Sequence, residues 1–111
     1  MNKLEVGMFI RTDDGKINKF KRYITDKKRV CETDMYARLA VDNIVKASFD
    51  IIDLIEVGDY VNGSKVIDIV ENDVYVSNFY KEQCIEQVSK KKIKSIVTKE
   101  QFESMSYRIG E

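Results

Sequence analysis

The side chains with the clearest chemical potential in this sequence are the cations between residues 16 and 29. This segment holds seven basic residues against one acidic residue, Asp26, which gives it a local charge of +6. Ammonium and guanidinium groups bind phosphates and carboxylates, and a neighbouring aromatic ring such as Phe20 or Tyr23 can stack on a nucleic-acid base. The basic residues are Lys16, Lys19, Lys21, Arg22, Lys27, Lys28 and Arg29.

Two interpretations of this segment stay open on the sequence. If the segment binds nucleic acid, its cations should line one exposed face beside an accessible aromatic ring. If it is only a solvated hairpin whose lysines shield a sheet edge, the cations should fan out and the rings should be buried. The whole chain has 19 basic and 19 acidic residues, so no net charge draws a polyanion in from a distance. This balance favours the solvated hairpin.

An acidic segment follows the basic one. Residues 30–56 hold six acidic and two basic residues, a local charge of −4. Such a segment can imitate nucleic acid and occupy a basic channel of a protein. Within it, Met35 and Tyr36 would suit a protein partner if they cluster with other exposed aromatic side chains. The alternative is that the aromatic side chains fill two small cores that lack tryptophan. Asp34, Met35 and Tyr36 are the candidate binding residues of this segment.

The sequence offers little to an enzyme. It contains no histidine, which removes the commonest general base and the commonest metal ligand. Neither phosphate-binding glycine motif occurs, and Cys31 and Cys84 lack the spacing of a metal site. We expect no catalytic residue, no cofactor and no metal. Both cysteines are interpreted as small core residues.

The beginning of the sequence and its hydropathy bear on location. The opening MNKLEVGMF lacks the apolar stretch of a signal peptide, and no run approaches the ~20 apolar residues of a membrane span. These features predict a cytoplasmic protein with reduced thiols and no membrane partner.

The strands and turns that must position these side chains are encoded by a sequence pattern that occurs twice. The stretch LEVGMFIRTDDGKINKF, which begins at Leu4, matches IEVGDYVNGSKVIDIV, which begins at Ile55. Each copy has an aliphatic residue, Glu-Val-Gly, an aromatic residue, a polar turn with glycine and a further apolar run. A repeated supersecondary unit dictates the architecture. We predict a mainly β fold of two related SH3-like small-barrel units, 1–54 and 55–111, in tandem, tightly packed and with short helical turns.

The pattern also predicts individual elements. In the segment 17–25 the alternation of apolar and polar residues is imperfect, so we expect a β-bulge or a twist there. Thr98, followed three residues later by Gln101, forms a capping box and predicts a helical turn over 101–105. Residues 84–88 and 93–97 are expected to pair as the last long hairpin. The other expected strands cover 6–12, 17–25, 29–33, 43–47, 65–71, 74–76 and 106–109, with a short helical turn within 34–40. The expected second core contains Val57, Tyr60, Val66, Ile69, Val76, Ile96 and Phe102.

Part of the chain resembles a group of uncharacterised small proteins encoded in phages and prophages of low-GC Gram-positive bacteria. The resemblance rests on SFDIIDLIEVGDYVNGSKVIDI, IKSIVTKEQFESMSYRIG and the opening LEVGMFIRT, and it does not include residues 27–42. It implies no catalytic residue. Small phage proteins without enzymatic motifs often bind and block a host factor, so the resemblance implies an anti-defence role of the anti-CRISPR kind.

Three functions follow from these observations. The first is a non-enzymatic, phage-derived binding protein that recognises a host or phage protein and inhibits a bacterial defence system. The second is a nucleic-acid-binding SH3-like module that uses the basic hairpin 16–29. An enzyme is the third and the least supported. The sequence identifies neither the partner nor the oligomeric state.

Overall fold

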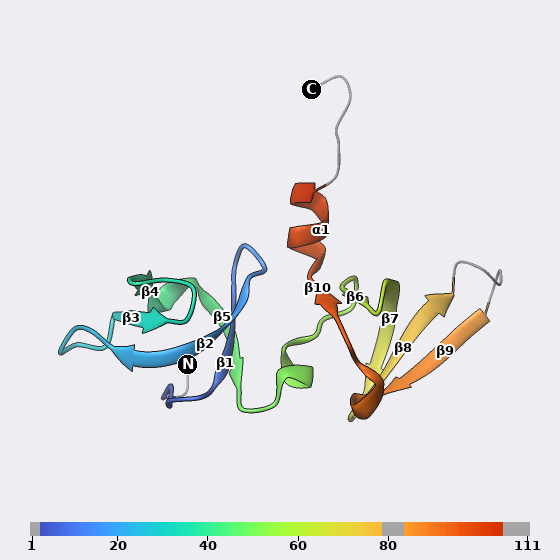
Figure 1. The fold of residues 1–111 in the computed structure, drawn as a ribbon, viewed down its shortest axis with the longest axis horizontal. Coiled ribbons are helices and arrows are strands. Elements are labelled where there is room, and N and C mark those ends of the chain that lie inside the picture. The colour runs from blue at the N-terminus through green and yellow to red at the C-terminus, as the bar shows by residue number, and fades with distance from the viewer. Residues whose placement is uncertain (1–2, 79–83, 106–111) are drawn as a thin grey trace, which may run out of the picture. The chain divides into compact units, whose positions relative to one another are not determined.

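The computed structural model of the chain describes residues 3–78 and 84–105, and within them the fold is mainly β, as the sequence predicts. The chain divides into two compact units, residues 1–54 and 55–111. Each unit contains one antiparallel sheet of five strands (Figure 1). Among the described residues, no helix is long and apolar enough to cross a bilayer.

The sheet of the first unit has the strand order β4-β3-β2-β1-β5. A short 3-10 helix, η1, precedes the last strand, and a second one, η2, follows that strand. The elements are β1 (Phe9–Thr12), β2 (Ile17–Tyr23), β3 (Val30–Thr33), β4 (Leu39–Ala40), η1 (Val41–Asn43), β5 (Ile44–Ser48) and η2 (Ile51–Leu54).

The sheet of the second unit has the strand order β10-β6-β7-β8-β9, which is the same arrangement with β6 in the place of β1. A 3-10 helix, η3, again precedes the last strand, but an α-helix follows it. The elements are β6 (Tyr60–Val61), β7 (Ser64–Val70), β8 (Asp73–Asn78), β9 (Cys84–Ser89), η3 (Lys90–Lys92), β10 (Ile96–Val97) and α1 (Lys99–Met105).

Both copies of Glu-Val-Gly form the same turn at the beginning of their sheet. The Met8 N–H donates to the Glu5 carbonyl at 3.0 Å, and the Asp59 N–H donates to the Glu56 carbonyl at 3.0 Å. The third residue of each turn is a glycine with a φ of +92° or +99°, in the left-handed region that side chains avoid. The repeat therefore encodes a glycine-dependent turn. For this reason the first strand begins at Phe9 and not, as expected, at residue 6.

The strand after each turn pairs in the same register. Phe20 donates its N–H to the Met8 carbonyl at 2.9 Å, and Val66 donates its N–H to the Asp59 carbonyl at 2.8 Å. A β-bulge lies directly after Phe20 in one unit and directly after Val66 in the other. The bulge expected within 17–25 is thus confirmed. Phe20 and Val66 are equivalent positions of the two units.

Each unit has its own core. The first unit buries Leu4, Ile10, Phe20, Cys31, Leu39 and Ile44 as one cluster. The second unit buries Ile55, Val61, Val66, Val74 and Val76. Except for Leu4 and Ile55, these residues lie on β-strands, where alternate side chains point to the same side.

The expected second core is right in part. Val66 and Val76 are buried, with exposed fractions of 0% and 2%. Val57 and Phe102 are exposed to 53% and 44%, so their assignment to the core is wrong. Val57 is the second residue of the Glu-Val-Gly turn, and Phe102 lies on an open side of α1. The remaining three positions, Tyr60, Ile69 and Ile96, are half-buried.

The expected last hairpin is also wrong. β9 pairs with β8, and β10 pairs with β6 through Val61 opposite Ile96. The 3-10 helix η3 separates β9 from β10 and redirects the chain across the sheet. Local patterns could not show this, because the partner of β10 lies far away in the sequence. The strand expected over 106–109 lies outside the described residues.

Two local signals have different outcomes. The capping box is confirmed, because the Thr98 hydroxyl accepts the Gln101 N–H and the Gln101 side chain accepts the Thr98 N–H, both at 3.2 Å. The helical turn within 34–40 is not formed. There the Thr33 hydroxyl accepts the N–H groups of Met35 and Tyr36, at 3.2 and 3.0 Å, and holds a turn that leads into β4.

Candidate interaction surface

The basic segment 16–29 lies mainly on β2 and on the loop that joins β2 to β3, and we call it the basic hairpin. The Ile24 N–H donates to the Val30 carbonyl at 2.8 Å and closes the loop. Within the loop, the Thr25 hydroxyl accepts the N–H groups of Arg29 and Val30, at 3.1 and 3.3 Å. Lys28 adopts a φ of 58°, which lets the chain reverse. The loop is therefore held by its own backbone and presents its cations from a defined turn.

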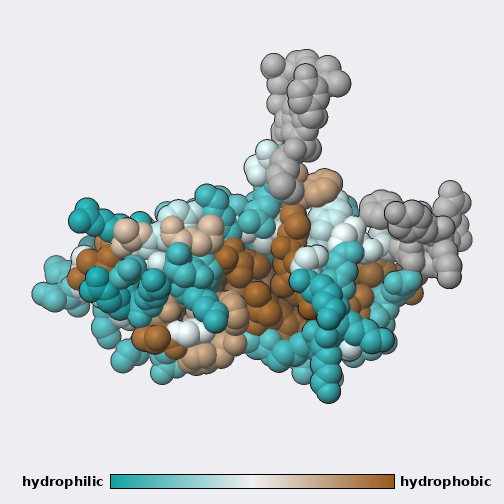
Figure 2. All heavy atoms as spheres, viewed as in Figure 1, coloured by the Kyte–Doolittle hydropathy of each residue, from teal (hydrophilic) through white to brown (hydrophobic). Residues whose placement is uncertain are grey.

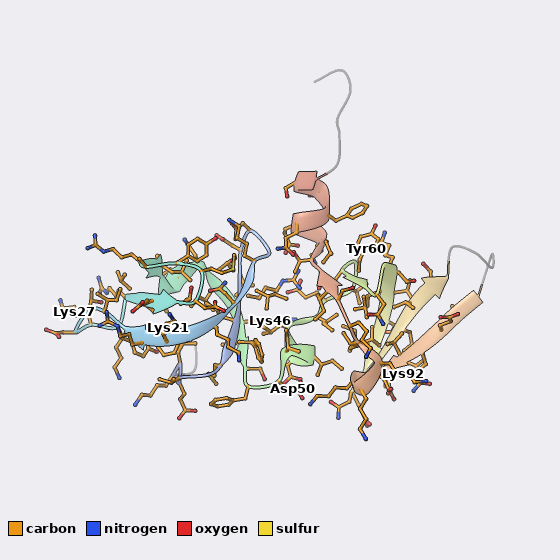
Figure 3. The ribbon with its side chains drawn as sticks, viewed as in Figure 1. Lys21, Lys27, Lys46, Asp50, Tyr60 and Lys92 are labelled. Carbon is orange, nitrogen blue, oxygen red and sulfur yellow. The ribbon has the colours of Figure 1, made fainter. Side chains whose placement is uncertain are left out.

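Most cations of the basic hairpin are exposed. The bulge after Phe20 places two consecutive residues, Lys21 and Arg22, in solvent. Figure 3 shows Lys27 at the tip of the hairpin and Lys21 further along β2. The tip, at the left of Figure 2, has a hydrophilic surface. The exposed cations are Lys19, Lys21, Arg22, Lys27, Lys28 and Arg29.

The aromatic rings of the basic hairpin belong to the core of the unit. Phe20 is exposed to only 3%, and the half-buried Tyr23 meets it edge-on with 5.0 Å between ring centroids. The Tyr23 hydroxyl accepts the Leu4 N–H at 3.0 Å. The Lys28 ammonium lies 5.5 Å from the Tyr23 ring centroid. Buried rings are the arrangement that we expected of a solvated hairpin, because such rings cannot stack on nucleic-acid bases.

Two carboxylates, those of Glu32 and Asp34, contact the basic hairpin, and one of them neutralises a cation. Arg22 forms an ion pair with Glu32 of β3 at 2.8 Å. The Asp34 carboxylate accepts the backbone N–H of Lys19 at 2.8 Å, so the structure brings these two predicted site residues together. By contrast, Lys21, Lys27 and Arg29 make no ion pair with any described residue, and they remain available to an external anion.

The other predicted site residues differ in exposure: one is on the surface and one packs against the core. Met35 is exposed to 53%, and Tyr36 packs half-buried against the core. The Lys16 ammonium lies 5.4 Å from the Tyr36 ring centroid and 3.7 Å from the Asp14 carboxylate. A hydrogen bond to Tyr36 and the charge of Asp14 raise the pKa of Lys16. Lys16 is therefore engaged within its own unit, apart from the cations at the hairpin tip.

The second unit carries a groove that sequence reasoning missed. Its volume is about 360 Å³, and it contains a stacked pair of rings, Tyr60 and Phe102, with centroids 4.2 Å apart and planes at 23°. The Lys99 ammonium is paired with Glu56 at 2.9 Å, and this hydrogen bond raises the pKa of Lys99. The groove is lined by Gly58, Tyr60, Lys65, Lys99, Phe102 and Glu103. Both rings were expected in the core. The signal in the sequence that could have indicated this site is that the two residues are aromatic.

The groups that could carry covalent or metal chemistry are few. Cys31 is fully buried, and burial raises the pKa of its thiol, so it stays protonated at neutral pH. Within residues 3–78 and 84–105, no group of three or more acidic, cysteine or histidine side chains could hold a metal ion.

No protein-family model matches the chain, and neither a curated protein nor a solved structure shows significant similarity to it.

Proposed function

We propose that this chain is a non-enzymatic binding protein, built from two SH3-like small barrels, that recognises an acidic surface of a protein partner through its basic hairpin. The SH3-like assignment is supported by the strand order shared by the two sheets and by the 3-10 helix before the last strand of each. The resemblance to small phage proteins supports a partner in a bacterial host and an anti-defence role.

The observation that carries the proposal is the difference between equivalent hairpins of the two units. In the second unit, β7 and β8 are joined by the two-residue loop 71–72, and this hairpin carries Asp68, Glu71 and Asp73. In the first unit, the loop spans residues 25–29 and contains three cations. The same framework folds with a short acidic hairpin, so folding does not require the longer basic one. A feature that the fold does not need is a candidate for function.

A protein partner agrees better with the basic hairpin than a nucleic acid does. Single-strand recognition uses accessible rings beside cations, and the rings of Phe20 and Tyr23 are packed into the unit. Glu32 and Asp34 lie on the adjacent strand and loop, so carboxylates interrupt the row of cations that a continuous phosphate backbone would have to follow. An acidic protein surface offers discrete carboxylates, which three exposed cations can pair with individually.

The exposed cations also support the alternative, a module that binds nucleic acid through its phosphates. Lys21, Lys27 and Arg29 have no described ion-pair partner, and phosphate contacts alone supply non-specific binding. The two functions predict different preferences between a polycarboxylate and a polyphosphate.

The test compares these two polyanions. Binding of the full chain to fluorescent polyglutamate and to oligothymidylate is measured by anisotropy between about 50 and about 200 mM salt. We expect polyglutamate to bind better. The combined reversal Lys27→Glu, Lys28→Glu and Arg29→Glu should weaken that binding at least about tenfold, or about 1.4 kcal/mol.

The chain provides a matched control for this variant. Lys90, Lys91 and Lys92 are three consecutive exposed lysines of η3, and their combined reversal changes the net charge by the same amount. This control should bind polyglutamate like the parent after correction for net charge. Stronger binding of oligothymidylate, lost with the hairpin reversal, would replace the proposal by the nucleic-acid alternative. Equal losses in both triple variants would contradict a defined surface.

A further inference from the structure

The groove of the second unit is the feature that the basic hairpin does not explain. Phe102 stacks on Tyr60 and yet keeps 44% of its surface exposed. Burying a phenylalanine side chain stabilises a protein, so an exposed ring on a short helix leaves that stabilisation unused. Exposed aromatic surface beside a hollow is typical of a contact site.

The first unit shows that the fold does not require this arrangement. There the last strand, β5, is followed by η2, whose Ile52 and Leu54 are buried with exposed fractions of 3% and 0%. In the second unit the last strand is followed by α1, which places Phe102 over Tyr60 and leaves it open. The unit therefore departs from its repeat by placing an α-helix and a stacked pair of rings where its counterpart has a 3-10 helix that buries aliphatic side chains.

The charges around the rings indicate the chemistry of the occupant. Lys65 lies directly opposite Tyr60 on the neighbouring strand, is exposed, and makes no ion pair with any described residue. Lys99 is already neutralised by Glu56, and Glu103 adds a carboxylate to the lining. A polyphosphate would meet this carboxylate here. A single carboxylate could pair with Lys65 while an adjacent apolar side chain covers the rings.

We propose that this groove binds an extended peptide segment of a partner protein in which an aromatic or large aliphatic residue lies close to an aspartate or glutamate. The apolar side chain packs on the Tyr60 and Phe102 rings, and the carboxylate pairs with Lys65. Gly58 also lines the groove, at a φ of +99° that favours glycine. This site is separate from the basic hairpin and does not depend on it.

The probe is an array of short synthetic peptides, each with one aromatic residue or leucine and one aspartate or glutamate at varied spacing. Matched peptides carry lysine in place of the acidic residue. The full chain should bind a subset of the acidic peptides and not their lysine counterparts. Phe102→Ala and Lys65→Glu should each weaken the binding at least about tenfold. Phe102→Leu keeps an apolar side chain on α1 and should lose less.

Two controls keep the result specific to the groove. Ile85→Ala removes an apolar side chain of similar exposure, 62%, from β9 and should leave binding unchanged. The hairpin reversal at 27–29 should also leave it unchanged, so this proposal and the proposed function fail separately. Thermal melting shows whether each variant is folded.

Three outcomes would overturn the proposal. The first is an array on which no acidic peptide binds the full chain. The second is a folded Phe102→Ala variant that binds like the parent. The third is an oligothymidylate that binds in a manner lost with Phe102→Ala, which would assign the groove to nucleic acid.

Discussion

At the scale of single residues, Asp59 connects the Glu-Val-Gly turn of the second unit to its helix. The side chain is fully buried, and its carboxylate accepts the N–H groups of Glu56 at 2.7 Å and of Lys99 at 2.9 Å. Met8 is the equivalent residue of the first unit. Its sulfur accepts the Glu5 N–H at 3.3 Å, which corresponds to the bond between Asp59 and the Glu56 N–H. Asp59 thus fixes the position of α1, and with it one side of the groove.

We predict that Asp59→Ala destabilises the protein, because two backbone donors lose their acceptor. Each buried donor left unsatisfied costs about 1–3 kcal/mol. Asp59→Asn retains one acceptor and should cost less. The measurement is denaturant unfolding of the full chain. The exposed Asp42 offers a matched control, since Asp42→Ala should change stability by no more than about 0.5 kcal/mol.

Equal stability of Asp59→Ala and Asp42→Ala would show that the buried carboxylate does not hold the turn and the helix together.

The sequence could not identify this role of Asp59. In the string VGDY it has the pattern of a solvated turn residue, and only its hydrogen bond to the Lys99 N–H, 40 positions away, distinguishes it. The same limit applies to Phe102, because a short helix can turn its aromatic residue inward or outward. The exposed cations, by contrast, were predicted correctly as exposed residues, since their burial is costly in any fold.

At the scale of elements, the doubled Glu-Val-Gly turn is the part of the fold that the sequence predicts best. Its glycine is required locally, because the third turn position has a positive φ, and this requirement is visible in the residue type. The bulge within 17–25 and the capping box at Thr98 are confirmed as well, because each is also signalled by residues that lie close together in the sequence. The pairing of β10 with β6 was missed, because it is decided by a partner strand remote in the sequence.

We predict that Gly7→Ala and Gly58→Ala are destabilising to a similar degree. A residue with a side chain pays about 1–2 kcal/mol in the left-handed region. The two costs should be alike, because the new Cβ would make only ordinary contacts at both sites, 3.4 Å to the Lys99 side chain and 4.0 Å to Phe49. Thermal or denaturant unfolding of both variants measures the effect. A neutral result at either glycine would contradict the equivalence of the two turns.

At the scale of the whole molecule, two sheets of the same strand order carry different surfaces. The first unit lengthens one hairpin and makes it basic, and the second replaces a buried 3-10 helix by a helix with an exposed ring. Each unit serves as the internal reference for the other. This comparison, more than the charge pattern alone, separates what the fold needs from the two surfaces that we propose for binding.

The central claim is that binding resides in the basic hairpin and that the fold does not depend on it. The most direct test exchanges the loop of residues 25–29 for the two-residue Glu-Asn loop of the second unit. The equivalent strands already support that loop, so the variant should melt as a folded protein. Its affinity for polyglutamate should fall at least about tenfold. A folded loop-exchange variant that binds polyglutamate as tightly as the parent would contradict the account.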